Sequence, residues 1–140
     1  MIDDLKVGQV LWLKVRYQID CVSDVKHPML IAKIEDNYIE LIALDKTAGK
    51  IHQLYRSYNH YINSQNPSEK VLYEDSYAQL NTKLTIERFP ELTSFRKTKN
   101  CLSKKKLKDL LEHYIEYQNN NVLDENRIIY MSKSELLEIN

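Results

Sequence analysis

The chain has 140 residues, of which 43% are hydrophobic and 29% are charged, a composition typical of a globular protein and unlike that of a disordered one. Its 20 basic and 20 acidic residues balance, which excludes a uniformly basic surface and limits any contact with nucleic acid to one face. No apolar stretch approaches the roughly 20 residues that span a bilayer, and the N-terminus lacks a signal-peptide pattern, so we expect a cytoplasmic protein without membrane contacts.

The first third of the chain predicts short strands. Residues 7–17 alternate apolar and polar side chains after Gly8, as in a strand with one buried face. Residues 28–34 and 38–44 are apolar runs separated by the turn sequence Glu-Asp-Asn, so we expect a hairpin. Pro28 fits the first position of a strand, where the backbone N–H is not needed.

The middle of the chain predicts further strands. Residues 51–62 fit neither the helical nor the strand period, and we expect a loop followed by a strand. Residues 63–70 predict a surface turn, and residues 75–89 alternate again. This alternation predicts two faces, with Tyr77, Gln79, Asn81 and Lys83 on one and Ala78, Leu80, Thr82 and Leu84 on the other.

The last third predicts the clearest helix. Ser103 is a suitable N-cap, and apolar residues then recur at helical spacing, which predicts a helix over about residues 103–118. After a polar break, residues 127–131 predict a short strand. Ser132 and Glu135 have capping-box spacing and begin a second short helix.

These elements predict a mainly β protein of the α+β class. We expect a small barrel or half-barrel of about five to six antiparallel strands, with the C-terminal helix packed on it. Residues 1–121 would form the barrel domain, and residues 122–140 would add their strand and short helix to the same domain.

Five segments taken in order resemble the MazF/PemK-like toxins. They are "VGQVLWLKV", "KHPMLIAKI", "IELIALD", "LTIERF" and "CLSKKKLKDLLEHY". The resemblance covers about residues 5 to 118 and extends to the RNA-antitoxin toxins of the ToxN and CptN type. It implies an SH3-like barrel and an endoribonuclease that cuts single-stranded RNA without a metal ion or other cofactor.

The resemblance implies a catalytic role for Lys26 and His27. Family members that pair with a protein antitoxin carry an arginine just before the strand-opening proline, and this chain has His27 there. Histidine can move a proton near neutral pH, which an arginine essentially cannot, and Lys26 could supply a cation. In the alternative interpretation, both side chains are only solvent-exposed loop residues.

The second family position is a threonine or serine at the end of the next strand. Asp45 occupies that position here, and Thr47 follows two residues later. The RNA-antitoxin members carry Thr-Ser and then lysine, which Lys46, Thr47 and Lys50 approximate after a shift. Asp45 could act as a base, although a carboxylate also repels a phosphate. Alternatively, these residues form a plain turn around Gly49.

Two further segments could contact RNA. Residues 54–62 interleave basic side chains with three tyrosines, a mixture that stacks on unpaired bases. Residues 95–108 hold the one strong basic cluster. The candidate RNA contacts are Lys50, Arg56, His60, Arg96, Lys97 and Lys99. In the alternative interpretation, the tyrosines pack the core and its rim, and the cations are solvated.

We therefore expect an endoribonuclease toxin of a toxin–antitoxin module. RNA supplies its own nucleophile, the 2′-OH, so a few groups that move a proton and stabilise charge are enough. The partners would be single-stranded RNA and an antitoxin, either a protein or a small RNA, in a homodimer or a protein–RNA assembly. The alternative function is a catalytically inactive SH3-like barrel that binds RNA or a protein partner.

Overall fold

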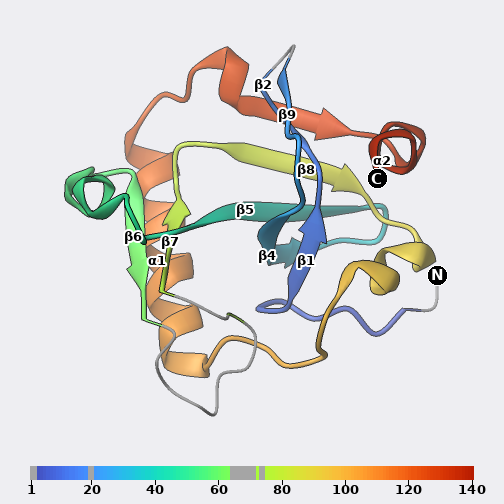
Figure 1. Cartoon of the computed structure of the whole chain (residues 1–140), viewed down its shortest axis with the longest axis horizontal. Coiled ribbons are helices and arrows are strands. Elements are labelled where there is room, and N and C mark those ends of the chain that lie inside the picture. The colour runs from blue at the N-terminus through green and yellow to red at the C-terminus, as the bar shows by residue number, and fades with distance from the viewer. Residues whose placement is uncertain (1–2, 19–20, 64–71, 73–74) are drawn as a thin grey trace.

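The computed structural model describes residues 3–18, 21–63, 72 and 75–140 (Figure 1). Strands dominate, as expected for a mainly β protein of the α+β class. The strands are β1 (Val10–Leu13), β2 (Arg16–Gln18), β3 (Cys21–Val22), β4 (His27–Ile34), β5 (Tyr38–Lys46), β6 (Asn59–Ile62), β7 (Ser76–Gln79), β8 (Lys83–Glu87) and β9 (Ile128–Met131). The helices are α1 (Lys104–Asn120), α2 (Lys133–Ile139) and the short 3₁₀ turns η1 (Ile51–Tyr55), η2 (Pro90–Phe95) and η3 (Glu125–Arg127).

Strand β5 lies at the centre of the sheet. The strand order is β1-β4-β5-β7-β6, and β5 also pairs with β8, which pairs in turn with β9. All these pairs are antiparallel except β8 with β9, which is parallel, so the expectation of an all-antiparallel sheet was wrong. No pairing among the described residues closes this sheet into a barrel.

The expected hairpin of β4 and β5 is confirmed, whereas the first expected strand is divided. Within residues 7–17, β1 pairs with β4, and the chain then turns into β2, which pairs only with β3. Gly8 allows the tight approach before β1, because its φ of 95° lies in a region that other residues rarely adopt.

The segment 75–89 does not form one continuous strand. Strand β7 pairs Leu44 with Ala78, whereas β8 pairs Leu41 with Leu84. Three residues of β5 therefore correspond to six residues along the β7–β8 segment, and this odd offset moves the side chains to opposite faces. Consequently Ala78 and Leu84, which the alternation placed together, belong to different hydrophobic cores.

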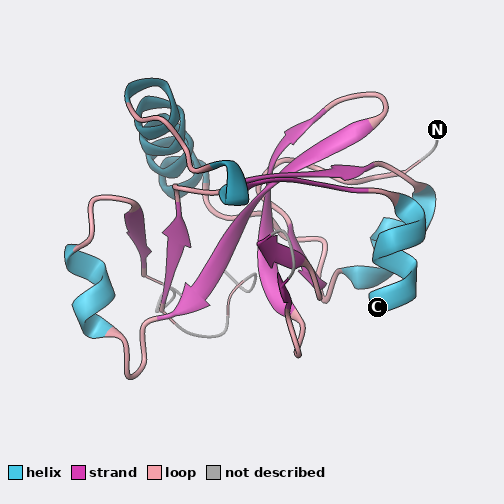
Figure 2. Cartoon of the chain, turned by 90° about the horizontal axis from the view of Figure 1, so that it is seen from above, coloured by secondary structure: helices cyan, strands magenta, loops and turns pink. Residues whose placement is uncertain are grey.

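Each face of the sheet buries its own core, because successive strand residues point to opposite faces. Core A contains Leu11, Leu13, Met29, Ile31, Ile39, Leu41, Leu84, Ile86, Ile129, Met131 and Leu136, with other apolar residues. Core B contains Val10, Leu30, Ile42, Leu44, Ala78, Leu80, Leu110 and Tyr114, with others, and lies under α1. Figure 2 shows α1 and α2 at different ends of the strands.

The expected helices are confirmed with their caps. Ser103 accepts a hydrogen bond from the Lys106 backbone N–H at 3.4 Å, and Ser132 accepts one from Glu135 at 3.2 Å. Within the described parts of the chain, no helix is long and apolar enough to cross a bilayer. The turn expected at residues 63–70 lies, apart from Asn63, outside the described residues.

The C-terminal segment packs onto the sheet. Arg16 of β2 pairs with Glu135 of α2 at 2.9 Å and donates to the Tyr130 carbonyl at 2.7 Å. The Asn140 side chain bonds both the N–H and the carbonyl of Lys14, at 2.8 and 2.9 Å. These contacts join the C-terminal segment to residues 14–16, while the parallel pairing of β8 and β9 joins it to the sheet.

Candidate functional site

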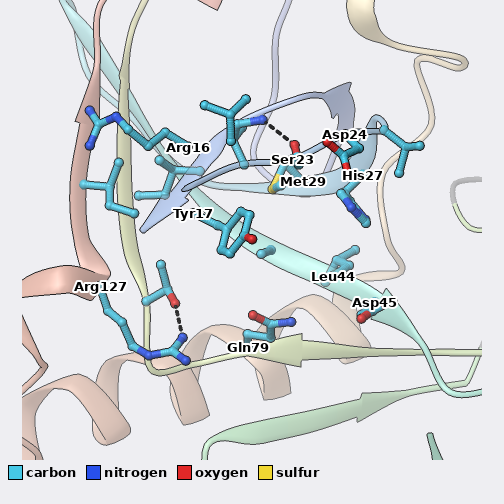
Figure 3. Close-up of a pocket in the computed structure, with 17 residues that line it drawn as sticks. Arg16, Tyr17, Ser23, Asp24, His27, Met29, Leu44, Asp45, Gln79 and Arg127 are labelled. Carbon is cyan, nitrogen blue, oxygen red and sulfur yellow. Dashed lines mark hydrogen bonds between the residues drawn. The ribbon is translucent and has the colours of Figure 1, made fainter. Parts of the chain in front are cut away.

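A pocket of about 470 Å³ lies on the core A face, between the β2–β3 hairpin and the ends of β4, β5 and β7 (Figure 3). Its apolar lining includes Met29, Ala43, Leu84 and Ile129. The polar residues that line it are Arg16, Tyr17, Ser23, Asp24, His27, Asp45, Gln79, Thr82 and Arg127. A pocket of this size with an apolar floor and convergent polar groups is the usual form of a small-ligand site.

The pocket brings together His27 and Asp45, which the sequence placed in one site. Met29 of β4 pairs with Ala43 of β5, and continuing this antiparallel register by two residues places His27 opposite Asp45. Two-residue steps keep side chains on one face, so both point to the same side as Met29 and Ala43. His27 and Asp45 are half-buried, and both line the pocket.

Asp45 is held by three donors. Its Oδ2 accepts from the Lys50 ammonium at 2.7 Å and from the Tyr77 hydroxyl at 3.3 Å. Its Oδ1 accepts from the Lys46 backbone N–H at 2.8 Å. The carboxylate therefore has a fixed orientation, and the Lys50 cation offsets its negative charge.

The Tyr77 hydroxyl, which donates to Asp45, is held in a buried position. Its side chain is only 4% exposed. Burial, followed by the charge and hydrogen bond of Asp45, raises the pKa of Tyr77 to about 12. Tyr77 therefore stays protonated at neutral pH and acts as a hydrogen-bond donor that orients the carboxylate.

The hairpin supplies the opposite wall of the pocket. The Ser23 hydroxyl accepts a hydrogen bond from the Val15 backbone N–H at 2.9 Å. This bond joins the residue before β2 to the residue after β3. Tyr17 lies beyond this bond, with 49% of its surface exposed. The neighbouring Cys21 raises the pKa of the Tyr17 hydroxyl, so this side chain is also neutral near pH 7.

Three residues of the expected catalytic set do not line this pocket. Lys26 is exposed, and its Nζ lies 5.0 Å from the centre of the Phe95 ring. Lys46 is exposed at the end of β5 and contributes its backbone N–H to Asp45. Thr47 donates its backbone N–H to the Asp75 carbonyl at 3.0 Å, with its hydroxyl at 3.4 Å from the same oxygen.

Among the expected RNA contacts, Lys50 is the one tied to this site. Arg56 is exposed after η1 and is not part of the pocket lining. His60 of β6 faces α1, where its Nδ1 lies 2.9 Å from Nδ1 of His113. Burial, together with His113, lowers the pKa of His60, which favours the neutral ring over a cation that would bind phosphate.

The basic segment before α1 has contacts of its own within the protein. Arg96 is 7% exposed at its side chain and pairs with Asp4 at 2.7 Å. Lys99 lies 3.3 Å from the same carboxylate, and Lys97 Nζ lies 3.8 Å from the centre of the Trp12 ring. Arg96 and Lys99 therefore bind Asp4 near the N-terminus, and neither residue lines the pocket.

Most of the polar residues that line the pocket were not among the candidates from the sequence, including Tyr17, Gln79 and Arg127. The alternating pattern predicted that Tyr17 and Gln79 lie in strands, but it did not indicate that the two residues share a site. Arg127 belongs to the segment beyond residue 121, which lies outside the family resemblance. The signal that could have suggested Arg127 is its position as the first residue of a predicted strand.

The described residues suggest proton transfer and anion binding as the chemistry of the pocket. The lining contains the His27 imidazole, the Asp45 carboxylate and the guanidinium groups of Arg16 and Arg127, and the Lys50 ammonium pairs with Asp45 from outside the lining. No three His, Cys, Asp or Glu side chains among the described residues gather as ligands for a metal ion.

Comparisons with known proteins add no family to these observations. No protein-family model matches the chain, and a search of curated proteins finds no significant match. The fold and the pocket therefore carry the functional argument.

Proposed function

We propose that this protein is an endoribonuclease that cleaves single-stranded RNA at the His27 end of the pocket. The observation that carries the proposal is the convergence of His27 and Asp45 in one pocket, with Lys50 paired to Asp45. Two adjacent strands hold His27 and Asp45, and rigid elements position reacting groups better than loops do.

The proposed reaction uses the 2′-OH of the RNA as its nucleophile. His27 accepts the 2′-OH proton while the oxygen attacks the adjacent phosphorus. The bond from phosphorus to the 5′-oxygen breaks, and that oxygen takes a proton from water at the open side of the pocket. The products are a 2′,3′-cyclic phosphate and a 5′-OH. Lys50 stabilises the charge that builds on the phosphate oxygens, and Asp45 positions Lys50.

We further propose that the sheet is an open variant of the MazF/PemK-like SH3-like barrel. Support comes from the consecutive pairing of β1, β4 and β5 and from the packing of α1 on the sheet. On this proposal the biological role is that of a cytoplasmic toxin controlled by an antitoxin, in agreement with the expectation from sequence.

A second candidate function is a binding module of the same fold that does not cut RNA. The observation that favours it is the presence of two carboxylates, Asp24 and Asp45, in the pocket lining, since uncompensated negative charge repels a phosphate. Lys50 offsets Asp45, whereas Asp24 is exposed at the rim.

Cleavage of labelled single-stranded RNA by purified protein separates the two functions. We expect wild type to yield 2′,3′-cyclic phosphate ends, and His27→Gln to lose at least about 100-fold in rate, because glutamine keeps a polar side chain but moves no proton. His52→Gln is the matched control, since His52 is exposed in η1 outside the pocket. A 2′-deoxy substitution at the cut should block cleavage.

Induced expression in a bacterial host tests the biological role. Growth arrest with new RNA 5′ ends, both lost in His27→Gln, would support the toxin. RNA binding without cleavage, together with normal growth, would overturn the nuclease and favour the binding module.

A further inference from the structure

The pocket continues beyond the proposed reaction centre. Beyond His27 and Asp45 the lining continues with Tyr17 from the hairpin, Gln79 at the end of β7, and Arg127 at the end of η3 (Figure 3). These three residues, which we call the base subsite, come from distant parts of the sequence. None of them has a part in the reaction proposed above.

Arg127 points to a ligand rich in hydrogen-bond acceptors. Its Nη1 donates to the Thr82 hydroxyl at 3.2 Å, and Thr82 is only 8% exposed, which fixes the guanidinium at the pocket wall. No carboxylate pairs with Arg127 in the part of the chain that the structure describes. A guanidinium has five N–H donors, so most of them are left for a bound molecule.

Gln79 presents an amide to the same space. It is half-buried, and no hydrogen bond of its side chain is seen within the described residues, whereas an amide can both donate and accept. The backbone of Gln79 is fixed by pairing with Asn59 of β6. Gln79 and Arg127 both line the pocket, and together we call them its polar edge.

Tyr17 supplies an aromatic surface opposite this edge. Figure 3 shows its ring projecting across the pocket toward Gln79. The hairpin that carries it is fixed by the Ser23 hydroxyl and by the contact of Arg16 with Glu135. An exposed tyrosine on a fixed support is the usual platform for an unpaired base, which stacks on the ring.

We propose that the base subsite receives one unpaired base of the RNA, next to the phosphate that is cut, with guanine preferred. This inference rests on the proposed function. The base stacks on Tyr17 while Arg127 and Gln79 contact its edge. Guanine is favoured because its O6 and N7 accept two hydrogen bonds from a single guanidinium.

Binding of short RNAs that cannot be cut tests the subsite without requiring catalysis. The probes are three trinucleotides, UGU, UAU and UCU, with 2′-O-methyl groups in place of each 2′-OH, titrated against the full chain by calorimetry. We expect wild type to bind UGU at least about fivefold more tightly than the other two. Arg127→Met should remove this preference, and Arg127→Lys should not restore it, because lysine lacks the bidentate donor pair.

Cleavage of a random single-stranded RNA pool supplies the second readout. Wild type should show guanine enriched at one position beside the cut, and Gln79→Ala and Arg127→Met should weaken that enrichment. Glu125→Ala removes a nearby exposed charge outside the pocket and should leave the enrichment unchanged.

Each outcome of these experiments supports or overturns the base subsite. Equal binding of the three trinucleotides, or no binding at all, would overturn the subsite. An equal loss of cleavage at every sequence in Arg127→Met would assign Arg127 to the phosphate and also overturn it. If wild type binds UGU preferentially but does not cleave RNA, the base subsite is supported and the proposed nuclease function is overturned.

Discussion

The Lys50 ammonium lies 2.7 Å from Oδ2 of Asp45, five residues earlier in the chain. The turn between them includes Gly49, whose φ of 74° returns the chain toward β5. Both partners keep contact with solvent, with 42% of the Lys50 side chain and 21% of the Asp45 side chain exposed. The pair therefore holds a partly exposed cation next to Asp45, which lines the pocket, and the proposed mechanism uses this cation to stabilise the phosphate.

Removal of this cation should impair catalysis more than stability. Lys50→Met keeps the length of the side chain but loses its charge, and we expect kcat/KM for RNA cleavage to fall by about 100-fold or more, as for a lost stabiliser of transition-state charge. The free energy of unfolding should change by less than about 1 kcal/mol, because the pair is partly exposed.

Cleavage kinetics and urea unfolding, run in parallel, check this prediction. Lys6→Ala is the control for the loss of one positive charge, since Lys6 is exposed and outside the pocket. Equal cleavage rates for Lys50→Met and wild type would remove Lys50 from the proposed mechanism.

The buried hydroxyl of Tyr77 should give the protein a specific sensitivity to alkali. Its pKa is about 12 in the folded chain, against about 10 in an unfolded one. The folded state therefore holds the proton more tightly, and this stabilisation is complete below pH 10. It is lost as the pH rises from 10 through 12, and the full loss amounts to about 3 kcal/mol.

Urea unfolding of wild type and Tyr77→Phe at several pH values between 8 and 12 isolates this effect. The other tyrosines titrate in both proteins, so the difference between the two curves reports Tyr77. We expect wild type to lose stability more steeply than the variant above pH 10. Parallel curves would show that Tyr77 contributes nothing in this pH range.

Local patterns explain which parts of the fold were predictable. The β4–β5 hairpin and α1 are encoded by short-range features, namely apolar runs around a turn and the Ser103 cap, and both were confirmed. The shift between β7 and β8 was not predictable, because the alternation continues through residues 80–82 without a glycine or proline to mark the break. The parallel position of β9 depends on packing across the sheet rather than on any local signal.

The site was predictable in part for the same reason. His27 and Asp45 are brought together by a hairpin that the sequence predicts, and the strand register places them opposite each other. Lys26 was placed in the site because it precedes His27, but adjacent residues at the start of a strand point to different sides. Arg127 depends on the long-range packing of the C-terminal segment, which periodicity does not report.

Substitution by alanine should lower the stability of the protein more at Gly8 than at Gly49. Both have positive φ, 95° at Gly8 and 74° at Gly49, so each substitution carries a conformational cost of about 1 kcal/mol. A Cβ at Gly8 would also lie 2.9 Å from Leu107 Cδ2 and 3.3 Å from Cys101 Cβ, whereas a Cβ at Gly49 would meet open space. We therefore expect Gly8→Ala to destabilise the protein by about 2–4 kcal/mol and Gly49→Ala by about 1 kcal/mol.

Thermal or urea unfolding of the two variants measures this difference directly. Each glycine variant is the control for the other, since both make the same chemical change at positive φ. Equal losses would mean that Leu107 moves aside without cost and that α1 is loosely packed at its first turns.

The pair of His60 and His113 should make the attachment of α1 to β6 sensitive to acid. Their Nδ1 atoms lie 2.9 Å apart, a distance that suits one donor and one acceptor but not two protonated rings. Burial, followed by the charge of His113, lowers the pKa of His60, while Asp109 acts in the opposite direction. The folded state thus favours the neutral ring, and the unfolded chain takes up a proton more readily as the pH falls below about 6.5.

The folded state is therefore most stable above the pKa that His60 has in the unfolded chain. This stability is lost as the pH falls toward the lower pKa that His60 has in the folded chain. We expect wild type to lose more stability than His60→Asn between pH 7.5 and pH 5, as measured by urea unfolding. His52→Asn is the control, because His52 is exposed in η1, and its curve should follow wild type. If His60→Asn also follows wild type, the acid sensitivity arises elsewhere and the histidine pair does not couple α1 to the sheet.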